Sequence, residues 1–180
     1  MKRKGYSLKI TVVLAMMTAI SIILGKYLAI RGGDIMRFSL ENMPIILSGI
    51  AFGPLAGVSV GVVADLVGCV LVGYTVNPLV TLGAAMIGLI SGFIPLIMKK
   101  TPLSGLPVTV ITVALSHLVG SIIIKTIGLY AYYTMPFGVL LLWRLLNYII
   151  VGALDCSVVH ILLNNKGVKK YISAMKEEKK

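Results

Sequence analysis

The sequence predicts an all-α membrane protein, built as a compact bundle of six transmembrane helices. Three observations lead to this prediction. The 180 residues are 58% hydrophobic and only 13% charged, whereas soluble domains are roughly 45–50% apolar and about 25% charged. The apolar residues gather in six segments, and the positive charges gather outside those segments. We therefore expect one integral-membrane domain over residues 1–180.

The six expected spans follow one another with short polar connections. About 20 apolar residues are needed to cross the hydrocarbon core. The expected bounds are 8–29, 40–52, 55–72, 79–98, 108–130 and 139–163. The first segment starts like a signal peptide, but it is too long for one and no clear cleavage site ends it. The second is short because Gly53-Pro54 interrupts it, so a tilted or buried helix is expected there.

The lysines and arginines predict the orientation. Most of the net charge of +11 lies before or at the start of the first span and after the last, at Lys2, Arg3, Lys4, Lys9, Lys166, Lys169, Lys170, Lys176, Lys179 and Lys180. Lys99 and Lys100 follow the fourth span, whereas the outer connections hold Arg31 and Arg37, with Lys26 near a helix end. Because positive residues favour the cytoplasmic side, beside anionic lipid, both termini are expected inside. This placement argues against nucleic acid as a partner.

Small residues recur four apart in three of the segments: Thr11, Ala15 and Ala19; Gly53, Gly57 and Gly61; Ala84, Gly88 and Gly92. Helices in lipid associate through close backbone approach, which such stripes permit. Internal packing is the expectation for the two glycine stripes. The Ala15–Ala19 stripe suits either internal packing or the surface for a partner membrane protein.

Polar side chains near the expected outer surface form the candidate binding site. Ionisable groups within a span are costly and therefore mark functional positions. The candidates are Arg144, Asn147, Lys125, Asn77, Tyr74, Arg37, Tyr130 and Tyr133. Arginine pairs with carboxylates and tyrosine stacks on rings, so an anionic, flat ligand fits. The alternative is that the cations reach the headgroups and the tyrosines form an interfacial belt.

Deeper ionisable residues are expected to have structural roles. Asp65, His117 and Asp155 are interpreted as hydrogen-bonded partners within the bundle; in a stand-alone secondary transporter, the same three would form a proton or ion relay. Gly57-Val58-Ser59-Val60-Gly61 matches a hydrolase pattern, but it lies in an apolar helix instead of a strand-turn-helix. The sequence has no P-loop motif, and its two cysteines have no metal-ligand spacing. We expect neither an enzyme nor a metal or cofactor site.

The segment RFSLENMPIILSGIAFGPLAGVSVGVVADLVG, residues 37–68, resembles the second and third helices of folate-type S components of energy-coupling factor (ECF) vitamin transporters. The matching positions are Leu40, Pro44, Ile45, Leu47, Gly49, Phe52, Gly53, Pro54, Gly57, Gly61, Asp65 and Gly68. NPLVTLGAAMIGLISG, residues 77–92, is similar to the family's fourth helix, and Ala15 and Ala19 match the Ala-x-x-x-Ala pattern of the first.

The resemblance implies a substrate-binding subunit that captures a vitamin and topples in the membrane to deliver it inside. Folate is the favoured vitamin. It implies a prokaryotic plasma membrane and three further subunits, a transmembrane coupling protein reached through Ala15 and Ala19 and two cytosolic ATPases. GYTVNP, residues 73–78, replaces a phenylalanine- and proline-rich loop of many folate-type members. Other vitamins or precursors, such as pantothenate and riboflavin, therefore stay open.

Overall fold

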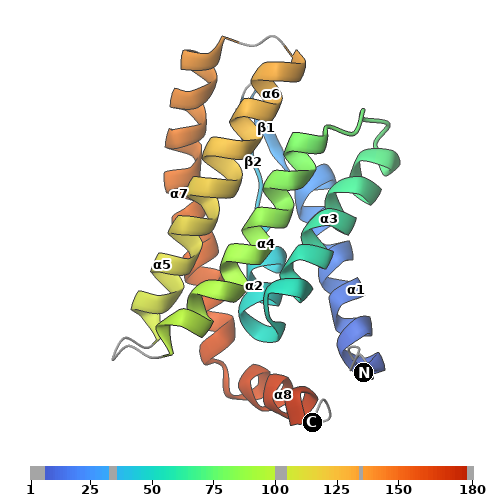
Figure 1. Ribbon diagram of the computed structural model, residues 1–180, viewed down its shortest axis with the longest axis vertical. Helices are drawn as coiled ribbons and strands as arrows, with labels where there is room; N and C mark the ends of the chain where they lie inside the picture. The colour runs from blue at the N-terminus through green and yellow to red at the C-terminus, as the bar shows by residue number, and fades with distance from the viewer. Residues whose placement is uncertain (1–6, 33–35, 100–104, 134–135, 178–180) are drawn as a thin grey trace.

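The computed structural model describes residues 7–32, 36–99, 105–133 and 136–177 and consists largely of helices. In chain order the elements are α1 (Leu8–Ile22), η1 (Ile23–Tyr27), β1 (Ile30–Gly32), β2 (Met36–Phe38), α2 (Asn42–Phe52), α3 (Pro54–Leu71), α4 (Pro78–Met98), α5 (Leu106–Ser116), η2 (His117–Ile124), α6 (Lys125–Tyr133), α7 (Phe137–Asn164) and α8 (Lys166–Glu177). The elements η1 and η2 are π-helical and continue the helices before them. Figure 1 shows the long helices side by side, with α4 near the centre.

Within the described residues, five stretches are long and apolar enough to cross a membrane. They are Leu8–Tyr27, Pro54–Leu71, Pro78–Met98, Leu106–Tyr132 and Phe137–Asn164. The remaining expected span, the second along the chain, corresponds to α2, which has only 11 residues and is mostly buried. A helix too short to cross the hydrocarbon core is tolerated where other protein elements, rather than lipid, surround it. The all-α membrane fold and the short second segment are therefore confirmed.

The glycine stripes lie where α3 and α4 meet. A Cβ atom built on Gly57 would lie 2.4 Å from the carbonyl oxygen of Gly88, and one built on Gly61 would lie 2.5 Å from that of Ala84. A Cβ atom on Gly92 would lie 2.3 Å from the main-chain nitrogen of Pro54. The backbones thus touch where any side chain would separate them. The expectation that the glycine stripes serve internal packing is confirmed except at Gly53, where a Cβ atom would meet nothing within 4 Å and the positive φ of +100° marks the turn between α2 and α3.

A small hairpin joins the first two membrane helices, and the sequence interpretation missed it. Strands β1 and β2 are antiparallel, with Ile30 opposite Phe38 and Arg31 opposite Arg37. Strand β2 packs against α7. The segment was expected to be a polar loop; tertiary contact with α7 supplies the stability that three-residue strands lack by themselves.

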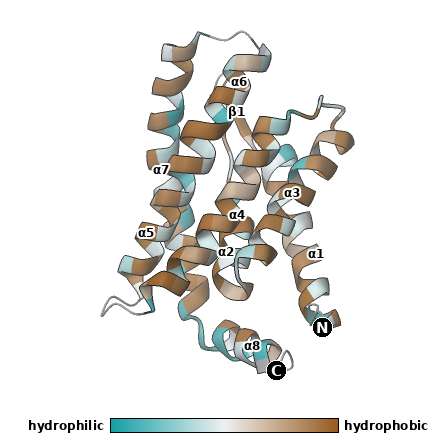
Figure 2. Cartoon of the chain, viewed as in Figure 1, coloured by the Kyte–Doolittle hydropathy of each residue, from teal (hydrophilic) through white to brown (hydrophobic). Residues whose placement is uncertain are grey.

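The basic C-terminal segment, which the sequence interpretation treated only as a charged flank, forms a helix. Residues 166–177 form α8, which lies across the end of the bundle where α1 begins (Figure 1). Met175 of α8 is buried in the core cluster, while Lys166, Lys169, Lys170 and Lys176 of this helix are exposed. Figure 2 shows hydrophilic and hydrophobic residues alternating along α8, in contrast to the hydrophobic long helices. Such an amphipathic helix suits a membrane–water interface.

Candidate functional site

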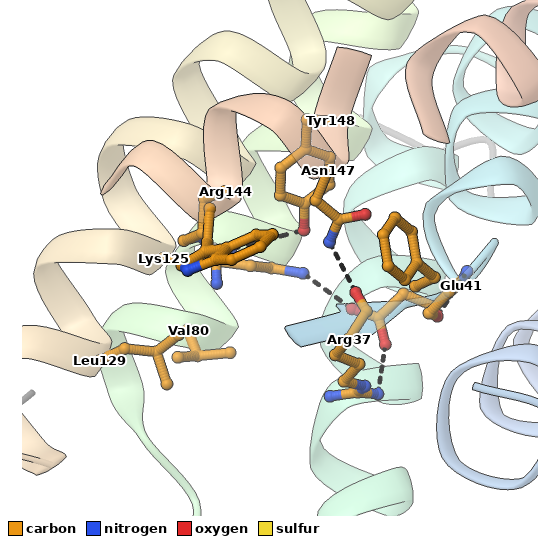
Figure 3. A pocket seen from close by; sticks show the side chains of 11 residues that line it. Arg37, Glu41, Val80, Lys125, Leu129, Arg144, Asn147 and Tyr148 are labelled. Atoms are coloured by element: carbon orange, nitrogen blue, oxygen red, sulfur yellow. Dashed lines mark hydrogen bonds and ion pairs between the residues drawn. The ribbon is translucent and has the colours of Figure 1, made fainter. Parts of the chain in front are cut away.

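A polar cavity lies between α7, α6, β2 and the start of α2. Its volume is about 100 Å³, and it is lined by Arg37, Phe38, Ser39, Glu41, Val80, Lys125, Leu129, Trp143, Arg144, Asn147 and Tyr148. Figure 3 shows the charged side chains converging from separate elements. We call this space the inner cavity. Its lining includes four of the residues expected from the sequence: Arg37, Lys125, Arg144 and Asn147.

Glu41 joins two of the cations. Its Oε1 accepts a hydrogen bond from Lys125 Nζ at 3.2 Å, and its Oε2 accepts one from Arg37 at 2.9 Å (Figure 3). The Lys125 side chain is 6% exposed and that of Glu41 is 22% exposed. Burial would raise the pKa of the Glu41 carboxyl, but Lys125, Arg37 and Lys26 hold that pKa well below its usual range. Glu41 is therefore a carboxylate throughout the physiological pH range.

The two π-helical segments hold the two arginines. Arg37 donates to the carbonyl oxygen of Gly25 in η1. Arg144 donates to the carbonyl oxygen of Ser121 in η2, from Nε at 3.2 Å and from a terminal nitrogen at 2.8 Å. Asn147 donates to the carbonyl oxygen of Arg37 at 2.6 Å and so ties α7 to the hairpin. π-Helical turns are rare overall, but those that occur are often found at functional sites. Here they supply the carbonyl oxygens that orient Arg37 and Arg144.

Aromatic side chains give the inner cavity flat walls. The guanidinium carbon of Arg144 lies 5.4 Å from the centre of the Tyr148 ring, within the range of a cation–π contact. Trp143 and Phe38 also line the cavity. The inner cavity thus combines cations, an amide and ring faces, which are the groups that a flat anionic molecule requires.

A second cavity adjoins the first and has a volume of about 410 Å³. We call it the outer cavity. It shares Arg37, Glu41, Val80 and Leu129 with the inner cavity, and it adds Lys26, Asp65, Cys69, Tyr74, Thr75 and Asn77. The ammonium group of Lys26 lies 5.8 Å from the Tyr74 ring centre. Arg37 and Glu41 therefore lie at the boundary between the two spaces.

The remaining expected site residues have different positions. Asn77 lines the outer cavity but is 4% exposed; its side chain caps α4 and donates to the carbonyl oxygen of Gly128 at 2.9 Å. Tyr130 packs edge-to-face on Phe137, with ring centres 5.5 Å apart, and is not among the described residues that line the two cavities. The side chain of Tyr133 lies outside the described part of the structure.

Among the lining residues that the sequence interpretation did not single out are Glu41, Trp143 and Tyr148. Glu41 stands directly before the apolar helix α2. An acid beside an apolar membrane segment is unusual, and this position could have marked Glu41 from the sequence. Trp143 and Tyr148 are neighbours in sequence of Arg144 and Asn147, and Tyr148 lies four residues after Arg144, on the same helix face. The helical spacing was therefore sufficient to find Tyr148.

The deeper ionisable residues are hydrogen-bonded, as the sequence interpretation expected. Thr81 of α4 donates to Asp65 of α3 at 2.6 Å. His117 Nε2 lies 2.9 Å from Asp155 Oδ2, and its Nδ1 lies 3.4 Å from the Ser121 hydroxyl. The His117 ring is 5.0 Å from that of Tyr148, centre to centre. This buried cluster therefore supports the Tyr148 wall of the inner cavity.

Ala15 and Ala19 lie on an exposed face of α1, together with Val12, Met16 and Ile20. The opposite face of α1 packs on the bundle, where Leu14 and Ile22 are buried. Internal packing therefore leaves the alanine stripe uncovered in the isolated chain.

Three solved structures are similar to this chain. FolT with bound folic acid aligns with a TM-score of 0.72 and 21% identity, over 89% of this chain and 96% of that one. The S component for biotin from an ECF-type ABC transporter aligns with a TM-score of 0.65 and 24% identity, over 92% and 96%. An S component of a bacterial ECF transporter aligns with a TM-score of 0.63 and 18% identity, over 86% and 92%. These likenesses establish a shared fold.

No curated protein matches the sequence significantly. The model of one protein family matches residues 5–170, nearly the whole chain, and that family is described as the S component of the ECF-type riboflavin transporter. With its helices, its buried cations and this match, the chain belongs to the family of ECF-type riboflavin transporter S components.

Proposed function

We propose that this S component captures folate from outside the cell and passes it inward through an ATPase-coupled module. The chain is not an enzyme in this proposal, because partner subunits hydrolyse ATP. It lies in the plasma membrane of a prokaryote, with both termini in the cytoplasm. The inner and outer cavities then lie toward the outside, because Arg144 and Asn147 belong to the second and third turns of α7, at the end opposite α8 (Figure 1).

The observation that carries the ligand proposal is the charge of the inner cavity. The lining holds three cations, Arg37, Lys125 and Arg144. It holds one carboxylate, Glu41, which leaves two positive charges. Folate carries two carboxylates and a flat pteridine ring. Its carboxylates match the cationic surplus, and its ring matches the walls formed by Trp143 and Tyr148. An uncharged ligand would leave the two charges unbalanced, which is costly where a cation is as buried as Lys125.

The dimensions favour a ligand that occupies both cavities. Ligand pockets commonly measure roughly 300–1,000 Å³, and the inner cavity of about 100 Å³ is too small for a vitamin. The outer cavity, at about 410 Å³, falls within that range and shares a boundary with the inner one. We propose that the charged end of the ligand enters the inner cavity while its remainder fills the outer cavity, beside Tyr74 and Asn77.

The exposed Ala15–Ala19 stripe supports a proposal about partners. Without side-chain bulk, a second helix approaches closely, which is the principal route to helix association in lipid. We propose that the transmembrane coupling protein of the ECF module binds here and connects the chain to two cytosolic ATPases. Membrane lipid covers the same face when the partner is absent.

A titration of the purified chain tests the ligand. Trp143 is the one tryptophan of the sequence and lines the inner cavity, so its fluorescence reports occupancy. We expect one-to-one folate binding by calorimetry, with a matching change in Trp143 emission. No heat and no spectral change in folded protein would exclude folate.

Riboflavin is the second candidate, because the matching family is described by it. Its flat ring would fit the aromatic walls, but it has no carboxylate to balance the cations. Tight riboflavin binding together with no folate binding would favour this candidate and keep the S-component function.

A further inference from the structure

We propose that Glu41 is an internal substitute for a ligand carboxylate: it neutralises Lys125 and Arg37 in the empty site and leaves them when an anionic ligand binds. This inference rests on the proposed function and deepens it, because it names the ligand as an anion and assigns the residue with which that anion competes. The sequence interpretation assigned Glu41 no role.

The contacts of Glu41 are those that a bound carboxylate would make. Its two oxygens bind separate cations, Lys125 at 3.2 Å and Arg37 at 2.9 Å. The two cations come from distant parts of the chain, α6 and β2. A ligand carboxylate placed between them would make the same pair of charge-assisted bonds. Two carboxylates so close together would repel each other, so Glu41 and the ligand exclude each other from this position.

The empty site needs such a substitute. Lys125 is almost wholly buried, and an unpaired buried charge is strongly unfavourable. Arg144 is held by the Ser121 carbonyl and not by Glu41. The internal carboxylate therefore stabilises the cationic site before the ligand arrives and keeps its side chains in position.

The main chain at Glu41 is fixed, so that the side chain alone has to move. Its carbonyl oxygen accepts a hydrogen bond from the Ser21 hydroxyl at 2.6 Å, and its amide donates to the Ser39 hydroxyl at 3.1 Å. The carboxylate packs against Gly25, where an added Cβ would lie 2.6 Å from Oε2. Rotation of the side chain is therefore the least costly way to vacate the cations.

The position of Glu41 at the boundary gives the displaced carboxylate a destination. Glu41 lines the outer cavity as well as the inner one. Lys26 lines the outer cavity too, and its charge already acts on Glu41. Rotation toward Lys26 would keep the carboxylate beside a cation, and it would also open the boundary between the two cavities.

A different role for Glu41 predicts the opposite result. If the carboxylate accepted hydrogen bonds from N–H groups of the ligand, its removal would weaken binding. If it competes with the ligand, Glu41→Gln removes the competitor and strengthens binding. A charge-assisted bond typically contributes enough for about a tenfold change in affinity. We therefore expect Glu41→Gln to bind folate roughly tenfold more tightly than the wild type.

The experiment compares three ligands by calorimetry on the full chain: folate, p-aminobenzoylglutamate, which has the same carboxylates without the pteridine, and riboflavin, which has no carboxylate. Glu41→Gln should strengthen binding of the first two and leave riboflavin unchanged. Glu177→Gln at the end of α8 changes the net charge equally and should behave as wild type. Glu41→Asp keeps the charge that supports folding but reaches the two cations less well, so an intermediate gain is expected.

The outcomes separate this proposal from the ligand proposal. Folate binding that weakens, or stays unchanged, in both Glu41 variants would overturn the competition and leave the folate function intact. Riboflavin binding that no Glu41 variant alters, with no folate binding to any folded variant, would overturn both the anionic ligand and the role of Glu41. Stronger folate binding by Glu41→Gln, with Glu177→Gln unaffected, would support both.

Discussion

Arg144 donates two hydrogen bonds to a single main-chain oxygen, the carbonyl of Ser121 in the π-helical segment η2. The same guanidinium group lies over the ring of Tyr148, which packs against His117. Arg144 is thus fixed by a backbone acceptor and an aromatic face, and its charge remains available to the inner cavity.

Replacement of Arg144 by alanine should weaken folate binding at least tenfold, because a charge-assisted bond to a ligand carboxylate is lost. Arg144→Lys should recover only part of the affinity, since lysine keeps the charge but not the planar fork of donors. Calorimetry on the purified variants measures both effects. Leu145→Ala, at an exposed neighbouring position, is the control, and full affinity in Arg144→Ala would contradict this assignment.

The contact between Gly57 and Gly88 should tolerate no side chain. A Cβ atom on Gly88 would lie 2.1 Å from the carbonyl carbon of Gly57. Gly88→Ala must separate α3 from α4, and overpacking of this kind costs roughly 1–3 kcal/mol or more. We expect a melting temperature lower by on the order of 5 °C in detergent. Gly138→Ala, whose Cβ would meet nothing within 4 Å, should melt as wild type; equal melting of the two variants would refute the packing argument.

The buried pair of His117 and Asp155 should contribute to stability. Asp155→Leu leaves the His117 nitrogen without its partner, and an unsatisfied buried group costs about 1–3 kcal/mol. The double variant His117→Phe/Asp155→Leu removes both groups and should recover part of that loss. A double-mutant cycle on unfolding measures the coupling. Additive losses would show that the two residues do not stabilise each other.

The alanine stripe should affect coupling and not ligand binding. Ala19→Trp places a large side chain on the exposed face of α1, where we propose that the coupling protein docks. Folate affinity should stay unchanged, whereas co-purification with the coupling protein and ATP-driven uptake into vesicles should fall at least tenfold, because close helix contact is lost. Val70→Trp, at a 74% exposed position on α3, is the control. Normal co-purification of Ala19→Trp would place the interface elsewhere.

The candidate site was partly predictable. Arg144 and Asn147 share one face of a helix, so their proximity followed from the helical spacing. The approach of Lys125 was suggested by its matching depth in the membrane. The hairpin that brings Arg37 to the same cavity was not predictable, because strands of three residues form only when other elements stabilise them.

The sequence by itself determined the membrane fold, the short second helix and the close packing of α3 on α4. These follow from segment length, from Gly53-Pro54 and from small residues four apart, which are local or periodic properties. Only the tertiary structure decided that Glu41 lies between Lys125 and Arg37, because these residues come from α6, β2 and the start of α2. It also decided that η1 and η2 are π-helical and turn carbonyls of Gly25 and Ser121 toward the two arginines. A charge network assembled from distant segments depends on their relative placement, and no periodicity in one segment encodes that placement.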